Sequence, residues 1–343
     1  MQIGVIGINH KSADLEFREF FAKVCQRRFD PLLSLHPSLS YVLLITCNRT
    51  EIYFHASDLS QIHCYLLSVL RHDIPEEFEH KVYSYFGTEC FIHLAMVTSG
   101  LDSALIAETE IQGQVKKAYE NFSNNHSLSS ELHFLFQKCL KIGKQIRSSF
   151  SQKLSFRAFP SMGEIILRKT AQLLGDPQKR RFLFVGASEI NRKILHEFKS
   201  HKIHQMTICN RSLANAEKWG WEYGMKILNW ERMKDALIDY DVILCATKAS
   251  DYLIKTEDID ESENKILIDL SVPRNIDPRI GNRCGKRIQL FNVDHLSGAV
   301  NQTKKYKALQ LAHFEKKIVA EEAIKQVSLF LSREKAKLQW AIL

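Results

Sequence analysis

A thiol and a cationic side chain lie two residues apart in the segment Thr46-Cys47-Asn48-Arg49. The apolar run 43–45 before it predicts a buried strand that carries Cys47 to its end. A thiol ionises more readily near a cation, and the thiolate is a nucleophile. In an extended segment Arg49 faces the same side as Cys47, and it could equally bind a substrate carboxylate. A free cysteine is also often a small buried hydrophobe, so both readings of Cys47 stay open.

A second group of residues could bind a nucleotide. The strand that ends at Val185 is followed by a turn that opens a helix, where backbone N–H groups and the helix dipole favour a pyrophosphate. The residues of this turn are Gly186, Ala187, Ser188, Glu189, Ile190 and Asn191. Ser188 and Asn191 replace two glycines of the G-x-G-x-x-G pattern, so the motif alone is weak, and an ordinary strand-to-helix turn stays open.

The end of the next strand refines the nucleotide prediction. An NAD-dependent enzyme would place an acidic residue there for the ribose 2′-hydroxyl, whereas this chain has Asn210, Arg211 and Ser212. An arginine at this position suits a 2′-phosphate, which favours NADPH over NADH. A solvated residue at the strand end is the alternative interpretation of Arg211.

The segment 89–119 concentrates polar side chains among apolar ones. His93 is expected on an apolar helix, where an isolated histidine is more often a satisfied core residue than a functional one. The other polar candidates are Ser99, Ser103, Glu108, Thr109, Glu110 and Gln114. A solvated helix face explains some of them, and substrate contact stays open for the rest.

Composition limits the classes of protein. The chain has 343 residues, of which 45% are hydrophobic, and this length predicts two or three domains. Its eight cysteines are scattered without a C-x-x-C or zinc pattern, so we expect no metal site and reduced thiols in the cytoplasm. No signal peptide and no long apolar run are present, so we expect no membrane partner. The net charge of +8 leaves a nucleic-acid partner open.

The elements that must position these residues follow from periodicity. Residues 1–85 alternate strand-like segments with helical ones, including a helix over 12–24, which is an α+β pattern. Residues 87–175 read as helices with a polar break at 123–131, and residues 178–290 alternate short buried strands with helices, which is typical of a parallel α/β sheet. After Gly298 one or two long amphipathic helices are predicted. Their expected apolar stripe is Leu311, Phe314, Ile318, Ile324, Val327 and Leu331.

Several motifs together resemble the glutamyl-tRNA reductase family. They are T-C-N-R-T-E at 46–51, H-L-x-x-V-x-S-G-L-D-S at 93–103, E-T-E-I-Q-G-Q-V-K-K-A-Y at 108–119, V-G-A-S-E at 185–189, N-R-S at 210–212 and D-L-S-V-P-R-N-I-D-P at 269–278. The order of these motifs matches over residues 1 to about 335. The first three are specific, and the last two are shared more loosely with shikimate-dehydrogenase-type NADP domains.

The resemblance implies an activity and a set of roles. It implies NADPH-dependent reduction of glutamyl-tRNA(Glu) to glutamate 1-semialdehyde with release of the tRNA, which is the first step of tetrapyrrole (porphyrin) biosynthesis by the five-carbon route. Cys47 would hold glutamate as a thioester, which suits a thiolate as nucleophile and leaving group. His93 is the family's activity-critical histidine. The implied substrate-binding residues are Thr46, Asn48, Arg49, Ser103, Glu108, Thr109, Glu110 and Gln114.

The resemblance also implies an α/β multidomain fold. We expect a ferredoxin-like α+β catalytic domain over 1–150, a Rossmann-type NADPH-binding domain over 151–290, and a long spinal helix over 291–343. The family continues into a helical dimerisation domain, for which too little chain follows residue 335, so a homodimer of the family kind is left open. Docking of glutamate-1-semialdehyde aminomutase and feedback by haem are likewise left open.

The chain departs from the family pattern at two sites. Ala107 and Glu110 stand where the family reads glycine and glutamine, and Ser188 stands where the nucleotide turn usually has glycine. Two other functions remain alternatives: a shikimate-dehydrogenase-like reductase of a small carbonyl compound, and an NADPH-sensing regulator that binds nucleic acid. The first leaves the T-C-N-R-T-E segment unexplained.

Overall fold

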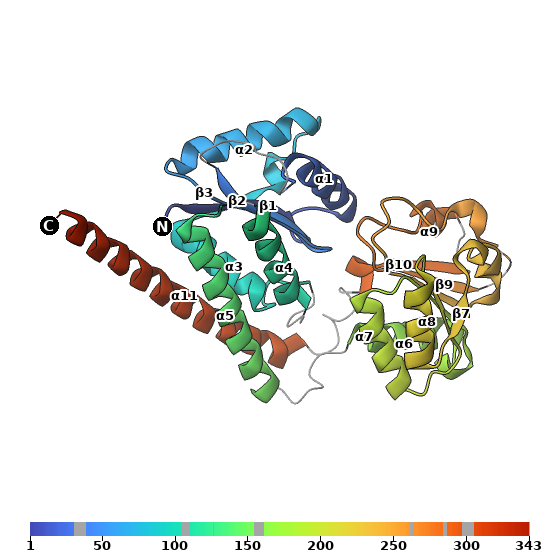
Figure 1. Cartoon of the computed structure of the whole chain (residues 1–343). Helices are drawn as coiled ribbons and strands as arrows, with labels where there is room; N and C mark the ends of the chain where they lie inside the picture. Colours follow the sequence, from blue (N-terminus) through green and yellow to red (C-terminus); the bar gives the residue numbers. More distant parts are fainter. Residues whose placement is uncertain are drawn as a thin grey trace. The chain divides into compact units, whose positions relative to one another are not determined.

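The computed structural model describes residues 1–30, 39–104, 110–125, 127–153, 161–260, 262, 264–283, 287–296 and 305–342. The chain divides into two compact units (Figure 1). Unit 1 comprises Met1–Ala158 and Lys305–Leu343, and unit 2 comprises Phe159–Lys304. The C-terminal helix thus belongs to the same unit as the N-terminal strands. The division of the sequence at 150 and 290 stays a prediction.

Unit 1 is built on a four-stranded antiparallel sheet of order β2-β3-β1-β4. Its strands are β1 (Ile3–Asn9), β2 (Ser40–Ile45), β3 (Arg49–His55) and β4 (Tyr83–Phe86), and the helices α1 (Leu15–Arg28) and α2 (Leu59–Asp73) are inserted among them. The resulting β-α-β-β-α-β order confirms the ferredoxin-like prediction. Figure 1 shows α1 and α2 on one face of the sheet.

The start of α1 follows from a local cap. The Asp14 carboxylate accepts the Phe17 N–H at 2.8 Å, which satisfies one of the free N–H groups at the helix N-terminus. The helix therefore begins at Leu15, three residues later than the sequence pattern indicates. Phe17 and Phe21 are buried against the sheet, whereas Phe20 is 39% exposed.

Four helices complete unit 1. They are α3 (Gly87–Thr98), α4 (Glu110–Asn125), α5 (Ser130–Lys153) and α11 (Lys305–Ile342). The helices α3, α4 and α5 contact the other face of the sheet, and α11 packs along α3 and α5. The polar break predicted at 123–131 is confirmed, because α4 ends at Asn125 and α5 begins at Ser130.

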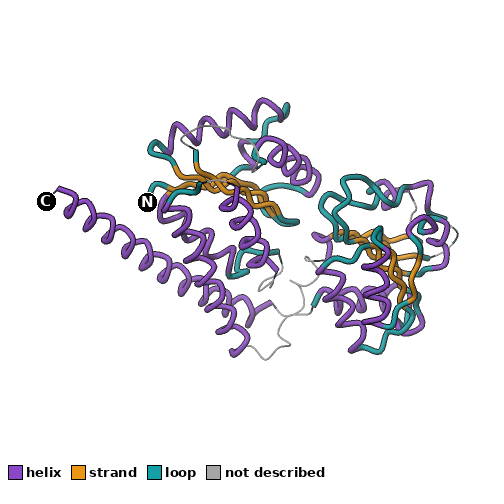
Figure 2. Tube along the Cα trace, viewed as in Figure 1, coloured by secondary structure: helices purple, strands orange, loops and turns teal. Residues whose placement is uncertain are grey.

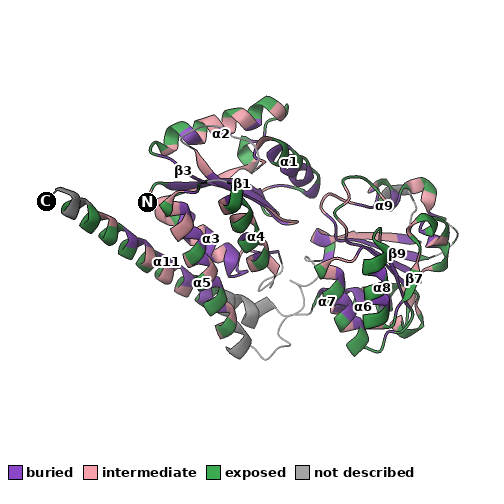
Figure 3. Cartoon of the chain, viewed as in Figure 1, coloured by how far each residue is buried: buried purple, intermediate pink, exposed green. Residues whose placement is uncertain are grey.

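The long helix α11 buries a different stripe from the predicted one. Its fully or nearly buried residues include Val319, Ala323, Val327 and Phe330. Of the predicted stripe, Val327 is buried and Ile318 is half-buried, but Phe314, Ile324 and Leu331 are 54%, 48% and 47% exposed. The Leu311 side chain lies outside the described part of the structure. The predicted stripe is therefore mostly wrong. Figure 3 shows buried residues on the side of α11 that faces α3 and α5.

Unit 2 is a six-stranded parallel sheet of order β10-β9-β8-β5-β6-β7. Its strands are β5 (Phe182–Val185), β6 (Met206–Cys209), β7 (Lys226–Leu228), β8 (Val242–Cys245), β9 (Lys265–Asp269) and β10 (Ile288–Asn292); its helices are α6 (Met162–Leu174), α7 (Glu189–Ser200), α8 (Leu213–Tyr223) and α9 (Arg279–Arg283). Helices and strands alternate along the trace (Figure 2). The predicted Rossmann-type fold is confirmed.

Short 3₁₀ turns lie at Glu79–Lys81, Pro177–Lys179, Trp230–Arg232, Asp235–Asp239 and Thr256–Asp258. In the part of the chain that the structure describes, each helix is too short or too polar to span a lipid bilayer.

Candidate active site

Cys47 lies at the tip of the hairpin that joins β2 to β3. The Thr46 N–H donates to the Arg49 carbonyl at 2.9 Å, and the Thr46 hydroxyl accepts the Asn48 and Arg49 N–H groups at 3.2 and 3.1 Å. Cys47 and Asn48 therefore form a two-residue turn, in which Cys47 is half-buried and Asn48 is buried. The prediction of an extended segment from Cys47 to Arg49 is therefore wrong. Because the chain turns between these two residues, the alternation of side chains along a strand does not place them on the same side.

The end of β1 supports this turn. Asn9 pairs with Arg49, and the His10 N–H donates to the Asn48 carbonyl at 2.9 Å. Burial, together with the charges of Lys11 and Arg49, lowers the pKa of His10 to about 4, so its imidazole is neutral at pH 7. The His10 Nδ1 atom is buried and has no hydrogen-bond partner within the described ranges.

Arg49 and Glu51 alternate along β3 and share one face of the sheet. The Arg49 Nη1 atom donates to Glu51 Oε1 at 2.7 Å, and both side chains are 0% exposed. The Tyr53 hydroxyl, two residues further along the strand, donates to the other Glu51 oxygen at 2.6 Å. The guanidinium that sequence reasoning offered as a substrate clamp is thus paired inside unit 1.

Glu51 also contacts residues outside its own strand. The Tyr83 hydroxyl and the His93 Nε2 atom lie 2.5 and 2.8 Å from Glu51 Oε1. Burial would raise the pKa of Glu51, but Arg49 and His93 outweigh that cost and hold it well below its ordinary range. Because the carboxylate is charged, we assign the proton of the His93 ring to Nε2.

Aromatic side chains enclose His93. Its ring centroid lies 4.9 Å from that of Tyr85 and 5.3 Å from that of Tyr83. The His93 side chain is 10% exposed. Contacts with both aromatic rings and with Glu51 fix the imidazole, so His93 is neither solvated nor a simple apolar core residue.

Asp102, which follows α3, extends this charged network. The Arg49 Nη2 atom donates to the Asp102 carbonyl at 2.6 Å and to its Oδ2 at 2.9 Å, and Lys11 forms a further ion pair with Asp102. Burial would raise the pKa of Asp102, but Arg49 and Lys11 lower it. Arg49 therefore joins two carboxylates, one of which contacts His93.

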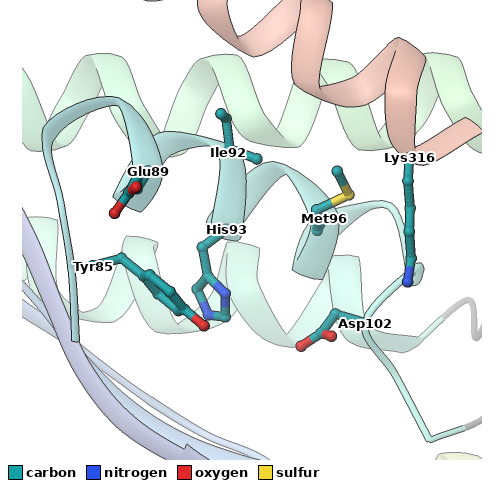
Figure 4. A pocket seen from close by; sticks show the side chains of 7 residues that line it. All are labelled: Tyr85, Glu89, Ile92, His93, Met96, Asp102 and Lys316. Carbon is teal, nitrogen blue, oxygen red and sulfur yellow. The ribbon is translucent and has the colours of Figure 1, made fainter. Parts of the chain in front are cut away.

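A pocket of about 350 Å³ opens beside His93 and Asp102 (Figure 4). Its volume lies at the lower end of the range for small-molecule sites. The lining residues are Tyr85, Glu89, Ile92, His93, Met96, Asp102 and Lys316. They come from β4, α3, the segment after α3 and α11, so the C-terminal helix contributes to this pocket.

The other predicted substrate residues lie outside the lining of this pocket. Ser103 is buried beside Asp102, and Glu110 and Gln114 are half-buried in the first turns of α4. Thr46, Cys47 and Asn48 are in the hairpin turn, connected to the pocket through Arg49 and Asp102. Glu108 and Thr109 lie outside the described residues.

The nucleotide turn of unit 2 has the conformation that close backbone approach requires. Gly186 has φ +97, and a Cβ atom there would lie 2.4 Å from the Ala246 carbonyl oxygen. The Ser188 hydroxyl accepts the Asn191 N–H at 3.3 Å and caps α7. Ser188, which replaces the usual glycine, therefore has a local structural role. Glu189 is exposed and pairs with Arg192.

Asn191 and Asn210 fasten this turn. The Asn191 Nδ2 atom donates to the Gly186 carbonyl at 2.7 Å, and its buried Oδ1 atom has no hydrogen-bond partner in the described part of the chain. The Asn210 Oδ1 atom accepts the Ala187 N–H at 3.0 Å. Ile190 is half-buried, and Arg211 and Ser212 are exposed at the end of β6. A tight glycine turn, a capped helix N-terminus and a neighbouring exposed cation fit a dinucleotide.

A buried carboxylate organises a second loop at the same edge of this sheet. Asp269, at the end of β9, accepts the N–H groups of Ser271, Asn275 and Ile276 at 3.0, 2.8 and 2.8 Å. Burial raises the pKa of Asp269 to about 6, and these hydrogen bonds only partly oppose the rise. The Asn275 side chain in turn accepts the Thr247 hydroxyl at 2.5 Å, which joins the loops after β8 and β9.

Several residues of these sites were not among the sequence candidates. Glu51 could have been found, because it follows Arg49 by two positions on a strand. Asp102 lay within a recognised motif but carried no chemical signal of its own. Lys316 lies more than two hundred residues from His93 in the sequence, so only tertiary structure could place it in the pocket.

Comparisons with known proteins agree with this arrangement. Residues 6–150 match the glutamyl-tRNA(Glu) reductase N-terminal domain, and residues 168–299 match the shikimate/quinate 5-dehydrogenase domain. A glutamyl-tRNA reductase of Glaesserella parasuis is 32% identical over 94% of this chain and 79% of its own length, and one of Syntrophobacter fumaroxidans is 29% identical over 94% and 71%.

Among solved structures, glutamyl-tRNA reductase from Methanopyrus kandleri has a TM-score of 0.46 at 21% identity, covering 98% of this chain and 81% of that one. The assignment to a family rests on the sequence relatives, because their similarity to this chain extends across both units. The nucleotide unit is accordingly of the nicotinamide-nucleotide-binding type. The chain belongs to the glutamyl-tRNA reductase family.

Proposed function

We propose that this protein reduces glutamyl-tRNA(Glu) to glutamate 1-semialdehyde with NADPH, through a thioester on Cys47. The observation that carries this proposal is the placement of Cys47 in a hairpin turn directly before Arg49, which is bonded to the Glu51–His93 pair. Family membership supports the substrate, because the relatives are glutamyl-tRNA reductases. The reaction would be the first step of tetrapyrrole biosynthesis, carried out in the cytoplasm.

The thiol chemistry divides a hard reduction into two steps. The Cys47 thiolate attacks the ester carbonyl, a carbon–sulfur bond forms, the ester carbon–oxygen bond breaks, and the tRNA ribose oxygen leaves with a proton. NADPH, when bound, supplies a hydride. Reduction at the thioester carbon then breaks the carbon–sulfur bond, releases the aldehyde and returns the Cys47 thiolate.

The neighbouring residues favour this chemistry in separate ways. The two-residue turn holds Cys47 at the tip of the hairpin, and the Thr46 hydroxyl closes this turn by accepting the Asn48 and Arg49 N–H groups. His93 is a positioned ring with its Nε2 proton directed at Glu51, so its orientation is set before substrate binds. Its neighbour Glu51 stays ionised, because Arg49 keeps its pKa low.

Covalent capture without the cofactor tests this proposal. Incubation of the wild-type protein with glutamyl-tRNA(Glu), in the absence of NADPH, should add one glutamyl group to Cys47 or deacylate the tRNA by hydrolysis of the thioester. Mass spectrometry of the Cys47 peptide and release of free tRNA are the measurements. Cys47→Ser should lower reduction at least about 1,000-fold, because the alkoxide needed for attack is not formed at neutral pH.

The matched control is Cys64→Ser, since Cys64 is an exposed thiol on α2. It should keep wild-type activity. Intact glutamyl-tRNA with an unmodified wild-type enzyme would contradict the proposal. Full activity of Cys47→Ser on a small free carbonyl compound would instead favour a shikimate-dehydrogenase-like function.

NADPH is the proposed cofactor because Arg211 follows β6 without an acidic neighbour. Its exposed guanidinium can pair with a ribose 2′-phosphate. Arg211→Asp should lower the NADPH-to-NADH ratio of kcat/KM about tenfold or more, since a charge-assisted hydrogen bond is lost and a like charge is added. Lys218→Asp, an equal charge change at an exposed position of α8, should leave the ratio unchanged. An unaltered ratio for Arg211→Asp would contradict this assignment.

The product is a reactive aldehyde, and this property supports transfer to a consuming enzyme. The recipient that we propose is glutamate-1-semialdehyde aminomutase. We also propose that the protein assembles as a homodimer.

A further inference from the structure

The loop that follows β8 lies directly against the nucleotide turn of unit 2. A Cβ atom on Gly186 would meet the Ala246 carbonyl oxygen at 2.4 Å and Thr247 Cγ2 at 2.7 Å, so no side chain separates the turn from the loop. The strands β5 and β8 are neighbours in the sheet, and the chain continues from β5 to β6 on the other side. In parallel sheets, ligands bind at such a point, where the strand order reverses.

Lys248 is the next residue of this loop, and both of its neighbours in the chain are fixed. The Thr247 hydroxyl donates to Asn275 Oδ1 at 2.5 Å and accepts the Ala249 N–H at 3.0 Å. The Asn275 Nδ2 atom donates to the Ala249 carbonyl at 3.1 Å. Lys248 itself is exposed and makes no hydrogen bond or ion pair with the residues that the structure describes. The backbone is therefore held, whereas the ammonium on its flexible stem is available to a ligand.

The nucleotide turn offers a diphosphate fewer backbone donors than a bare helix N-terminus does. Three N–H groups of the turn and of the first turn of α7 are already bonded within the protein. They belong to Gly186, Ala187 and Asn191, and their distances to the acceptor oxygens are 2.8, 3.0 and 3.3 Å. Because backbone donors carry only partial charge, a cation at this edge of the sheet would add the stronger, charge-assisted contact to a diphosphate.

The cations around the turn have different surroundings. Arg192, in the first turn of α7, is paired with Glu189. Arg211 follows β6 and is proposed above to bind the ribose 2′-phosphate. Lys248 follows β8, on the opposite side of β5 from β6. Arg211 and Lys248 therefore come after the two strands that flank β5, whose own turn is the predicted diphosphate site.

We infer that Lys248 binds the diphosphate of the nicotinamide dinucleotide and so supplies charge that the Gly186 turn lacks. This inference rests on the cofactor part of the proposed function and adds a residue to it. Lys248 follows Ala246, which touches the turn, by two residues, a span of at most about 7 Å, so its long side chain reaches a diphosphate bound at Gly186. The role differs from that of Arg211, because NADPH and NADH share the diphosphate and only NADPH has a 2′-phosphate.

Binding titrations with NADPH, NADH and ADP-ribose test this inference. All three contain the adenosine diphosphate, but NADH and ADP-ribose lack the 2′-phosphate, and ADP-ribose also lacks the nicotinamide. The Kd of each is measured by calorimetry on the full chain, without tRNA, for wild type and Lys248→Gln. In the variant the Kd should rise about tenfold for all three probes, because a charge-assisted hydrogen bond common to them is lost. The ratio of the NADPH and NADH Kd values should stay unchanged.

Two further variants sharpen this test. Lys248→Arg keeps a cation at the same place, and its Kd values should stay within about threefold of wild type. Lys226→Gln removes an equal charge from another exposed lysine of unit 2 and should bind all three probes as wild type does. Lys226 begins β7, at the amino end of a strand of the same parallel sheet, so it lies away from the edge that carries the nucleotide turn. An equal rise of Kd in Lys226→Gln would mean that net charge, and not the position of Lys248, sets the affinity.

Each other outcome in Lys248→Gln overturns the inference and leaves the proposed function intact. A rise of Kd for NADPH alone would place Lys248 at the 2′-phosphate. A rise for both dinucleotides with an unchanged Kd for ADP-ribose would place it at the nicotinamide half. Unchanged Kd values for all three probes would exclude a contact with the cofactor.

Failures of the proposed function are recognisable in the wild-type protein. A wild type that binds neither NADPH nor NADH would contradict the proposed cofactor and, with it, the role of Lys248. A missing adduct on Cys47 in the capture experiment would contradict the thiol chemistry alone, because the titrations need neither tRNA nor a thioester.

Discussion

Glu51 in unit 1 and Asp269 in unit 2 are both buried carboxylates, with exposures of 0% and 2%, but they are stabilised in opposite ways. Glu51 contacts a guanidinium, two hydroxyl groups and an imidazole. Asp269 accepts three backbone N–H groups, with no cation bonded to it in the described parts of the chain. The pKa of Glu51 is lowered, whereas that of Asp269 is raised to about 6. The full charge of Arg49 accounts for this difference, because N–H dipoles offset burial only in part.

The two arrangements serve different tasks. Glu51 remains charged and joins Arg49, which precedes it in the strand, to His93 on α3, so one network spans the strand and the helix beside the pocket. Asp269 shapes the loop over 271–276 and, through Asn275, ties it to Thr247 after β8. The first carboxylate orients side chains, and the second fixes a backbone at the nucleotide edge of a sheet.

Removal of the Glu51 charge should have the largest effect on stability. Glu51→Gln leaves Arg49 buried with Asp102 as its remaining carboxylate, and the loss of one partner of a buried ion pair costs about 3–5 kcal/mol. Hydrogen exchange of the β3 amides, converted to an opening free energy, measures this cost within unit 1. Because His93 loses its anionic partner, kcat should fall as well.

A double variant gives the control for this experiment. Replacement of both partners, Arg49→Met with Glu51→Leu, removes the charges together and should recover part of the lost stability, although not the activity. Recovery is incomplete because the Tyr53 and Tyr83 hydroxyl groups and His93 lose their acceptor. A loss of stability below about 1 kcal/mol in Glu51→Gln would mean that the burial of the Arg49 charge does not depend on Glu51. This result would contradict the contrast between Glu51 and Asp269.

The sequence allowed both folds to be predicted, because the signals that specify them are local. Alternating strands and helices indicated an α+β pattern in the N-terminal region and the parallel sheet in unit 2, and the resemblance to the family added the ferredoxin-like order. The Asn125–Ser130 break fell where polar residues gather. The stripe of α11 failed for a physical reason. Several apolar stripes are compatible with its sequence, and packing on α3 and α5 selects the one that contains Val319, Ala323, Val327 and Phe330.

The candidate site was predictable in part. Cys47, His93 and Gly186 were identified from their types and motifs. The predicted placement of Cys47 and Arg49 on one side of an extended segment was wrong. The Thr46 hydroxyl accepts the Arg49 N–H, so the chain turns between Cys47 and Arg49 and the alternation of side chains along the strand ends there. The alternation does hold within β3, where it places Arg49 and Glu51 on one face of the sheet and allows their ion pair. Asp102 and Lys316 depend on contacts between distant segments, which no spacing within the sequence encodes.

A smaller loss of stability is expected at Asp269. Asp269→Asn replaces an oxygen acceptor by an amide that cannot serve all three N–H groups, so it should cost about 1–3 kcal/mol. Three of the four tryptophans, Trp219, Trp221 and Trp230, lie in unit 2, whereas Trp340 belongs to unit 1, so fluorescence during urea unfolding in a Trp340→Phe background reports on unit 2. Asp235→Asn, at an exposed position, is the control and should change stability by less than about 0.5 kcal/mol.

The pH dependence of these two variants gives the sharpest contrast between the carboxylates. The folded-state pKa of Asp269 is raised from 3.8 to about 6, so the native unit 2 binds the proton more tightly than the unfolded chain. Its protonation therefore stabilises the fold at low pH, and this stability is lost as pH rises from about 4 to about 6. Glu51 has the opposite sign: its stabilisation is present above its ordinary pKa of 4.5 and declines as pH falls below that value.

Urea unfolding of wild type and Asp269→Asn between pH 4 and pH 7 should accordingly show a stability difference that shrinks as pH rises and becomes constant above about pH 6. The change across this interval should exceed about 1 kcal/mol, because a shift of one pKa unit corresponds to about 1.4 kcal/mol. For Glu51→Gln, hydrogen exchange should show a difference that is constant above pH 5 and shrinks below it. A difference for Asp269→Asn that grows with pH would contradict this contrast, because it would mean that the three N–H groups and the Ser271 hydroxyl together outweigh burial and keep the Asp269 pKa low without a cation.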